Sequence, residues 1–323
     1  MIKKTFTFVI VTLALLGFCS CVPKEKESQR LILAENLVPL SSITIIAQIN
    51  GYFVDNGLDV ETVTFSSGKA ALDAVLGGSA DYATVAETPI MFAGARSLPV
   101  RVLGTFTSSP DDCKLVVNTI KGIEDPKDLK GKKIAALQGT SSHYFLSKFL
   151  SENGLSFSDI EFLSMRPTEM PAAFSRGDID GYAMWEPHAS RGMKSIGSDA
   201  TFFSGASFYT ETFNIAFVGD SETLNDEVHV KFLRALLDAQ NFINTEKEEA
   251  IRIVAKKTGM EIEELSDIWE NYDFKVEIMP GFEDLLSSQY EWAVSEKIIQ
   301  KASQVDIDFS QLMYRNPLNT VSN

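Results

Sequence analysis

The sequence has 323 residues, with 29 Lys and Arg against 44 Asp and Glu, and a formal net charge of -15. Hydrophobic residues make up 45% and charged residues 23%, an ordinary globular composition that excludes a collagen, a coiled coil or a disordered chain. The acidic balance argues against a nucleic acid as partner, because phosphate backbones need clustered Lys and Arg. It leaves room for small anions, which a few local dipoles can hold.

The start of the chain has the pattern of a secretory signal. Lys3 and Lys4 form a short basic region, and an almost wholly apolar stretch runs from Phe6 to Phe18. This stretch is too short for a comfortable membrane span. The sequence therefore predicts a signal peptide over residues 1–20 and an extracytoplasmic protein, in the periplasm or at the outer face of the cell membrane.

The end of this segment, LLGFCSC, resembles a bacterial lipobox, in which a small residue precedes a cysteine that is lipidated and becomes the new N-terminus. Cys21 follows Ser20 and fits this pattern better than Cys19, although Phe18 stands where Leu is usual. We expect a lipid anchor at Cys21, with residues 21–30 as lipidated N-terminus and flexible tether. Because one acyl chain binds a membrane only marginally, a stable anchor needs more than one.

After the tether, strand-like and helix-like segments alternate along the chain. The first set predicts a strand at 31–34, a helix from Ser41 or Ser42 to 49, a strand at 58–65, a helix at 68–76, a strand at 82–85, a helix at 89–95 and a strand at 99–106. The second predicts strands at 113–117 and 133–137, a helix at 141–153, a strand at 160–163, a helix at 170–176 and strands at 179–185 and 213–218. Four helices follow, at 225–244, 246–258, 262–272 and 283–301. The alternation implies parallel sheets covered by helices, followed by a helical C-terminus.

The two α/β sets repeat one theme. In GKAALDAVLGGSADYA and in MPAAFSRGDIDGYA, a helix ends near Gly and an acidic residue precedes a strand. Asp81 and Asp180 occupy these matching places. They are either catalytic carboxylates or, as the pattern favours, turn residues at the start of a strand.

Four stretches resemble, in order, the solute-binding proteins of ABC importers for aliphatic sulfonates, taurine, nitrate and thiamine-precursor pyrimidines. They are NGYFVDNGLDVETV, GKAALDAVLGGSADYATVAETPIMFAGARSLPVRVLGTF, EDPKDLKGKKIAALQGTSSHYFLSKFL and FSRGDIDGYAMWEPHASR. The resemblance covers about residues 31–220. It implies an α/β fold of the type II periplasmic-binding-protein class, with two lobes joined by two crossing strands and ligand between them.

We expect the crossings at 112–117 and 213–218, which makes lobe 1 discontinuous. The predicted division is then lobe 1 over 31–112, lobe 2 over 113–213, and lobe 1 again with the C-terminal helices over 214–323. Such lobes close around a ligand like a hinge. The implied function is a monomeric lipoprotein that delivers a small organic anion, a sulfonate or a taurine-like molecule, to an ABC permease and its ATPase.

The most informative local feature is GTSSH after the strand KKIAAL. A strand, a tight turn and a helix start aim several backbone N–H groups in one direction, and the hydroxyls of Thr140, Ser141 and Ser142 add donors. Together they form an anion site without Lys or Arg. The alternative is that Thr140 and Ser141 merely cap the helix. His143 either donates to the anion or is a partly exposed helix residue.

Further candidates lie at other strand ends, where open α/β sheets bind ligands. Trp185 is a candidate to cover the apolar part of the ligand, and Glu186 to meet an ammonium group. Glu87 and Thr88 occupy the corresponding loop of lobe 1. The first loop and the return crossing add three more candidates, Ser41, Ser42 and Asn214.

The sequence predicts neither an enzyme nor a cofactor. It contains no G-x-S-x-G, no HExxH and no P-loop, and His188 and His229 lack metal-ligand spacing, so we expect no metal site. Cys113 opens an apolar run and is expected to be a buried structural thiol rather than a nucleophile. The alternatives that remain are a binding protein for nitrate or a thiamine-precursor pyrimidine, an enzyme on the same fold, and a sensory surface lipoprotein.

Overall fold

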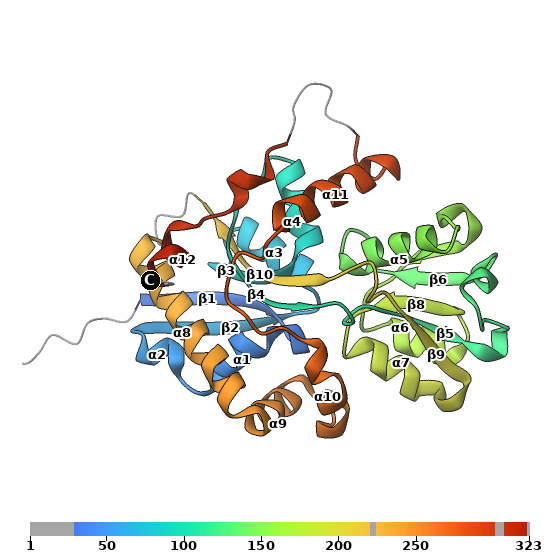
Figure 1. Ribbon diagram of the computed structural model, residues 1–323, viewed down its shortest axis with the longest axis horizontal. Helices are drawn as coiled ribbons and strands as arrows, with labels where there is room; N and C mark the ends of the chain where they lie inside the picture. The colour runs from blue at the N-terminus through green and yellow to red at the C-terminus, as the bar shows by residue number, and fades with distance from the viewer. Residues whose placement is uncertain (1–28, 220–223, 301–306, 322–323) are drawn as a thin grey trace, which may run out of the picture.

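The computed structural model describes residues 29–219, 224–300 and 307–321. The predicted signal peptide, Cys19, Cys21 and most of the tether therefore lie outside the described residues. The rest forms two lobes side by side, each with a five-stranded sheet covered by helices (Figure 1). Buried apolar side chains of both lobes form one large cluster.

The sheet of lobe 1 has the strand order β2-β1-β3-β10-β4. Its strands are β1 (Gln29–Asn36), β2 (Leu58–Phe65), β3 (Tyr82–Ala86), β4 (Val100–Ser109) and β10 (Glu211–Val218). β1 is parallel to β2 and β3, whereas β10 is antiparallel to β3 and β4. β1, β2, β3 and β4 therefore all run in one direction, as the expected parallel sheet requires. Only β10, which enters from the other lobe, runs against its neighbours and makes the sheet mixed.

The sheet of lobe 2 repeats this plan in the order β7-β6-β8-β5-β9. Its strands are β5 (Lys114–Asn118), β6 (Lys133–Ala136), β7 (Glu161–Ser164), β8 (Gly181–Met184) and β9 (Ala200–Ser204). β6 is parallel to β7 and β8, and β5 is antiparallel to β8 and β9. The edge strand β9, which the sequence did not predict, is only partly buried and therefore lacks a continuous apolar run.

Helices cover both sheets (Figure 1). Those of lobe 1 are α1 (Ser42–Ile49), α2 (Tyr52–Asp55), α3 (Gly68–Leu76) and α4 (Glu87–Ala95), and those of lobe 2 are α5 (Ser141–Glu152), α6 (Met170–Arg176) and α7 (His188–Ile196). The C-terminal helices are α8 (Asp226–Thr245), α9 (Lys247–Thr258), α10 (Ile262–Ile268), α11 (Phe282–Ser295) and α12 (Asn316–Val321). The prediction of a helix over 283–301 is too long, because α11 ends at Ser295 and Lys297 adopts a left-handed conformation with φ of 59°.

Asp81 and Asp180 hold equivalent positions in the two sheets. Oδ2 of Asp81 accepts a hydrogen bond from the Ile32 amide at 2.7 Å, and Oδ2 of Asp180 accepts one from the Lys133 amide at 2.9 Å. Each carboxylate thus joins the start of one strand to its parallel neighbour. This confirms the interpretation of both residues as strand-start residues.

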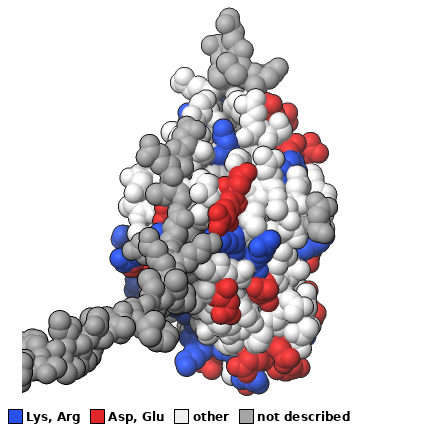
Figure 2. Space-filling model, turned by 90° about the vertical axis from the view of Figure 1, so that its left-hand side faces the viewer, with Lys and Arg blue, Asp and Glu red and all other residues white. Residues whose placement is uncertain are grey.

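The chain crosses between the lobes through residues 110–113, which connect β4 to β5, and residues 205–210, which connect β9 to β10. Residues 213–218, expected to form the second crossing, instead belong to β10 inside the lobe 1 sheet. The predicted lobe boundaries stay a prediction, because the connecting residues 110–113 and 205–210 belong to neither sheet. On the outer end of lobe 1, acidic and basic side chains are interspersed rather than gathered into a patch of one sign (Figure 2).

Candidate ligand-binding cleft between the lobes

A narrow pocket lies between the lobes, where the carboxyl ends of β1, β3, β6 and β8 meet. We call it the head pocket; it is lined by Asn36, Val38, Leu40, Gly68, Lys69, Ala86, Pro89 and Phe213 from lobe 1, by Thr140, Ser141 and Trp185 from lobe 2, and by Glu211 beside the second crossing. The pocket is small, with about 10 Å³ open to the centre of a water molecule. Strand ends facing each other across a cleft are where open α/β sheets bind ligands.

The start of α5 forms the lobe 2 wall of this pocket. Thr140 occupies the N-cap position, but its Oγ1 donates to the Leu137 carbonyl at 2.7 Å and makes no capping hydrogen bond. Oγ of Ser142 accepts from the Leu137 amide at 3.1 Å, so this hydroxyl belongs to the turn rather than to the pocket lining. Capping by Thr140 is therefore wrong, and the first turn of α5 retains N–H donors beside the pocket.

His143 lies in an aromatic cluster and is not among the residues that line the pocket. Its ring stacks on Phe162 with centroids 5.1 Å apart and meets Trp292 at 5.2 Å, while the Gly139 amide donates to Nδ1 at 3.4 Å. Burial lowers the pKa of His143 to about 4, so the ring is neutral near pH 7. The expectation of a partly exposed residue is wrong, because aromatic rings cover this face of α5.

Trp185 follows β8 and is 4% exposed. Its indole lines the head pocket, and Nε1 is buried without a hydrogen-bond partner among the residues that the structure describes. A buried donor without a partner costs about 1–3 kcal/mol. An acceptor atom brought within hydrogen-bond distance of Nε1 would remove that cost.

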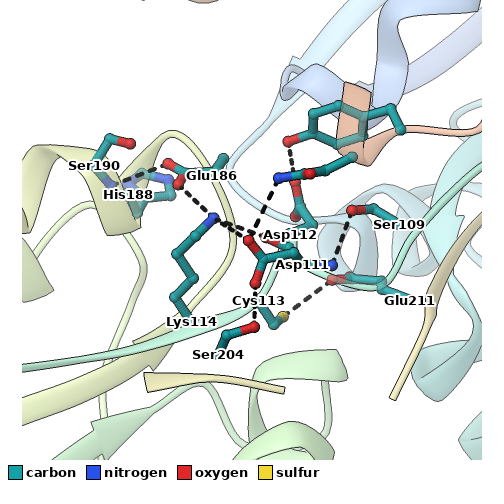
Figure 3. A network of polar contacts seen from close by, with 12 residues as sticks. Ser109, Asp111, Asp112, Cys113, Lys114, Glu186, His188, Ser190, Ser204 and Glu211 are labelled. Atoms are coloured by element: carbon teal, nitrogen blue, oxygen red, sulfur yellow. Dashed lines mark hydrogen bonds and ion pairs between the residues drawn. The ribbon is translucent and has the colours of Figure 1, made fainter. Parts of the chain in front are cut away.

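Glu186, the next residue, uses both of its carboxylate oxygens for contacts within lobe 2 (Figure 3). Its Oε1 lies 3.1 Å from Nζ of Lys114, and its Oε2 accepts from the Ser190 amide at 3.0 Å in the first turn of α7. Lys114 also donates to the Asp111 carbonyl at 2.7 Å. Glu186 is not among the lining residues, so the expected contact with an ammonium group has no support in this geometry.

Glu211 is the acidic residue that does line the pocket, and sequence reasoning missed it. The Cys113 thiol donates to its Oε2 at 3.0 Å, and the Ser141 hydroxyl is hydrogen-bonded to the same carboxyl group. Burial, reinforced by the negative charges of Asp112 and Glu87, raises the pKa of Glu211 well above its usual value. The raised pKa favours the neutral form of the carboxyl group, which does not repel an anion. Glu211 reaches the pocket because β10 lies between β3 and β4, and the sequence alone does not reveal this strand order.

Cys113 is buried, as expected. Burial and the nearby Glu211 and Asp112 raise its pKa well above the usual value, so it remains a thiol. A thiol is a far weaker nucleophile than a thiolate. Nothing in this environment activates Cys113 for chemistry.

Glu87 ties three elements together at the start of α4. Its Oε2 accepts from the amide and the hydroxyl of Thr212 at 2.9 and 3.1 Å, and its Oε1 accepts from Nε2 of Gln289 at 2.8 Å and from the Tyr209 hydroxyl. Thr88 is fully buried, with Oγ1 3.4 Å from Oε1 of Glu87. Both residues hold α4 against β10 and α11 and are outside the pocket lining.

The remaining predicted residues are also bonded within lobe 1. The hydroxyls of Ser41 and Ser42 donate to the carbonyls of Asn36 at 2.6 Å and Pro39 at 2.5 Å. Asn214 accepts from the Thr105 hydroxyl at 2.7 Å and donates to the Val85 carbonyl. Of the eleven predicted ligand contacts, the structure brings Thr140, Ser141 and Trp185 to the pocket.

Within residues 29–219, 224–300 and 307–321, no group of three or more His, Cys, Asp and Glu side chains is placed to hold a metal ion. Within the same ranges, no helix is long and apolar enough to cross a membrane.

Two α/β lobes with a pocket between their facing strand ends are the fold of the periplasmic binding proteins. The chain belongs to the NMT1/THI5-like family, whose model matches residues 39–250. It is 27% identical over 301 residues to the putative aliphatic sulfonates-binding protein of Bacillus subtilis (strain 168). This match covers 90% of this chain and 89% of that protein. It is 30% identical over 143 residues to the taurine-binding periplasmic protein of Escherichia coli (strain K12), 44% of each chain.

A solved structure has the same fold. The alkanesulfonate-binding protein SsuA from Xanthomonas axonopodis pv. citri, bound to MOPS, superposes with a TM-score of 0.78 at 19% identity. The match covers 89% of this chain and 99% of that one.

Proposed function

We propose that this protein is the extracytoplasmic binding protein of an ABC importer, which captures a small organic sulfonate or a taurine-like molecule between its lobes. Two relatives named for aliphatic sulfonates and for taurine support this assignment. The observation that carries it is the set of free donors at the head pocket, namely the first turn of α5 and the unpartnered Nε1 of Trp185.

A sulfonate suits these donors because its charge is spread over three oxygens, each of which accepts hydrogen bonds. The helix start supplies positive potential and N–H donors, and the Trp185 indole supplies a further N–H. The Ser141 hydroxyl and the Glu211 carboxyl group are hydrogen-bonded to each other, and the raised pKa of Glu211 favours its neutral form. The site therefore binds an anion even though the whole chain carries a net charge of -15.

The role requires binding and release without catalysis, and delivery to a membrane permease and its ATPase. A lipid at Cys21 would hold the protein at the membrane where the permease lies. Labelling with a fatty-acid analogue should be lost in Cys21→Ala. Labelling that persists in this variant would move the lipid site to Cys19.

The ligand class is tested by thermal shift and titration calorimetry with ethanesulfonate, taurine, nitrate and a hydroxymethylpyrimidine. A ligand that binds the folded state raises the melting temperature by mass action. We expect the sulfonates to do so. If only the pyrimidine or only nitrate raises the melting temperature, the sulfonate proposal is wrong.

The place of binding is tested with Thr140→Ala combined with Ser141→Ala. We expect sulfonate affinity to fall about tenfold, the scale of one to two hydrogen bonds to a charged group. Ser151→Ala is the control, because Ser151 is an exposed residue near the opposite end of α5. Unchanged affinity in the double variant would remove the helix start from the site.

A further inference from the structure

A second and larger chamber, which we call the outer chamber, lies beside the head pocket. Lys69 and Pro89 line both spaces, so the two adjoin each other. The outer chamber offers about 420 Å³ to the centres of water molecules, against about 10 Å³ in the head pocket. One water needs about 10–15 Å³ measured in this way. In this conformation the head pocket therefore has room for no more than the smallest polar end of a ligand, and the outer chamber is the adjoining space that can take a larger remainder.

Polar and apolar side chains both line the outer chamber. Its large apolar side chains, which we call the floor, are Leu72 and Leu76 from α3, Phe92 from α4, and Leu98 and Ile298 from the segments that follow α4 and α11. Small-molecule sites typically combine apolar side chains with a few placed polar groups. This floor fits a hydrocarbon chain or ring better than a two-carbon, fully hydrated molecule.

Of the two basic residues that line the outer chamber, only Lys69 has a carboxylate partner among the described residues. Lys69 is paired with Asp73 at 3.2 Å, and both line the chamber. The Arg96 guanidinium lies over the Phe92 ring, 5.9 Å from its centroid, and forms no ion pair with the described residues. Arg96 is thus a cation without a carboxylate partner at the edge of an apolar floor, and it can bind a carboxylate or sulfonate with two parallel hydrogen bonds.

The spacing of these groups sets the length of the ligand. Pro89, in the first turn of α4, borders the head pocket, and Arg96 comes directly after the last residue of α4. At 1.5 Å per residue, the seven steps from Pro89 to Arg96 span roughly 10 Å. A benzene ring bearing an acidic group at each end, together with the reach of the arginine side chain, bridges this distance.

We propose that the physiological ligand is an organic dianion, with a sulfonate in the head pocket, an apolar body on the floor of the outer chamber and a second anionic group at Arg96. This inference rests on the proposed function for the head group only. It makes Arg96 the residue that selects the far end of the ligand. It also accounts for an outer chamber far larger than taurine requires.

The test is titration calorimetry with ethanesulfonate, benzenesulfonate and 4-sulfobenzoate. We expect affinity to increase in that order. Arg96→Gln should weaken binding of 4-sulfobenzoate about tenfold, towards the affinity for benzenesulfonate, because it removes one charge-assisted contact. Leu76→Trp should weaken both aromatic ligands by narrowing the chamber and leave ethanesulfonate unaffected. The matched control is Arg234→Gln, an exposed arginine of α8 that lines neither chamber.

The outcomes separate this inference from the proposed function. If ethanesulfonate binds and 4-sulfobenzoate binds no tighter than benzenesulfonate, the dianion is overturned while the sulfonate site stands. The same follows if Arg96→Gln weakens the two aromatic ligands equally. If none of the three probes binds, the proposed function fails and this inference fails with it.

Discussion

The thiol of Cys113 donates a hydrogen bond to the carboxyl group of Glu211, with Sγ and Oε2 3.0 Å apart (Figure 3). Cys113 ends the first connection between the lobes, and Glu211 is the first residue of β10 after the second. One hydrogen bond thus links the two crossings, and one of its partners also lines the head pocket. The state of the Glu211 proton therefore bears on ligand binding.

Glu211→Gln should keep the affinity for an organic anion and remove its dependence on pH. Glu211 has a pKa raised by burial and by Asp112 and Glu87, and it also faces the Cys113 thiol and the Ser141 hydroxyl. As the pH rises, ionisation of Glu211 brings negative charge into the pocket, so wild-type affinity should fall. Glutamine has nearly the same shape and never ionises. Calorimetry from about pH 6 to pH 9 measures both profiles; parallel profiles would contradict the assignment.

Trp185→Phe should separate binding from stability. The substitution removes Nε1, which has no partner among the described residues, so the free energy of unfolding without ligand should not decrease. Sulfonate affinity should fall about tenfold, because one hydrogen bond to a charged acceptor is lost. Urea unfolding and calorimetry on the same samples test the two halves. A loss of stability with unchanged affinity would show that the indole serves packing alone.

Gly68→Ala should both destabilise the fold and weaken binding. An added Cβ would lie 2.9 Å from Cα of Val85 and 3.2 Å from the carbonyl oxygen of Thr84, so α3 must move away from β3. Overpacking of this kind costs about 1–3 kcal/mol. Gly104→Ala in β4 is the control, because its Cβ would meet nothing closer than 3.4 Å. Thermal unfolding should show the larger loss for Gly68→Ala; equal losses would contradict the close approach of α3.

Glu35→Gln should flatten the pH dependence of stability. Glu35 is buried in β1, and this burial raises its pKa to about 7, against a hydrogen bond of 2.6 Å from the Thr44 hydroxyl that lowers it. The folded protein thus holds a proton that the unfolded chain releases above about pH 4.5, so stability falls as the pH rises from about 4.5 to about 7 and levels off above that. The substitution should recover on the order of 3 kcal/mol at pH 8 relative to pH 5.

The measurement for Glu35→Gln is urea unfolding at the two pH values. Glu248→Gln, an exposed residue of α9, should unfold with the pH dependence of the wild type. A Glu35→Gln variant that keeps the wild-type slope would show that Glu35 ionises in the folded protein.

Contiguous patterns predicted much of the fold. The bounds of β2, α3 and α6 agree with the predicted ranges residue for residue, since apolar alternation or a glycine stop marks their ends. The strand-start role of Asp81 and Asp180 followed from the repeated motif. For the cleft, the helix start after KKIAAL and the residue after β8 were found because parallel strands bind ligands at their carboxyl ends.

The site features that the sequence did not predict depend on contacts between residues far apart in the chain. Glu211 reaches the pocket only because β10 lies between β3 and β4, and no local pattern indicates which distant strand fills that gap. Conversely, Glu87 directly follows a strand, where ligand contacts are expected, but it binds Gln289, which lies 202 residues further along the chain. No local pattern predicts that partner. His143 was misjudged for the same reason, because Trp292 covers it from α11.

The position of β10 also dictates an order of assembly. All five strands of the lobe 2 sheet lie between Lys114 and Ser204, so that sheet has its full set of strands before β10 has left the ribosome or the export channel. β3 and β4 have no direct pairing and must wait for Glu211–Val218 to arrive between them. Lobe 1, although it starts first, is thus completed last. A chain that ends before Glu211 would carry all five strands of the lobe 2 sheet, attached to a lobe 1 sheet in which β3 and β4 have unpaired edges that are prone to aggregation.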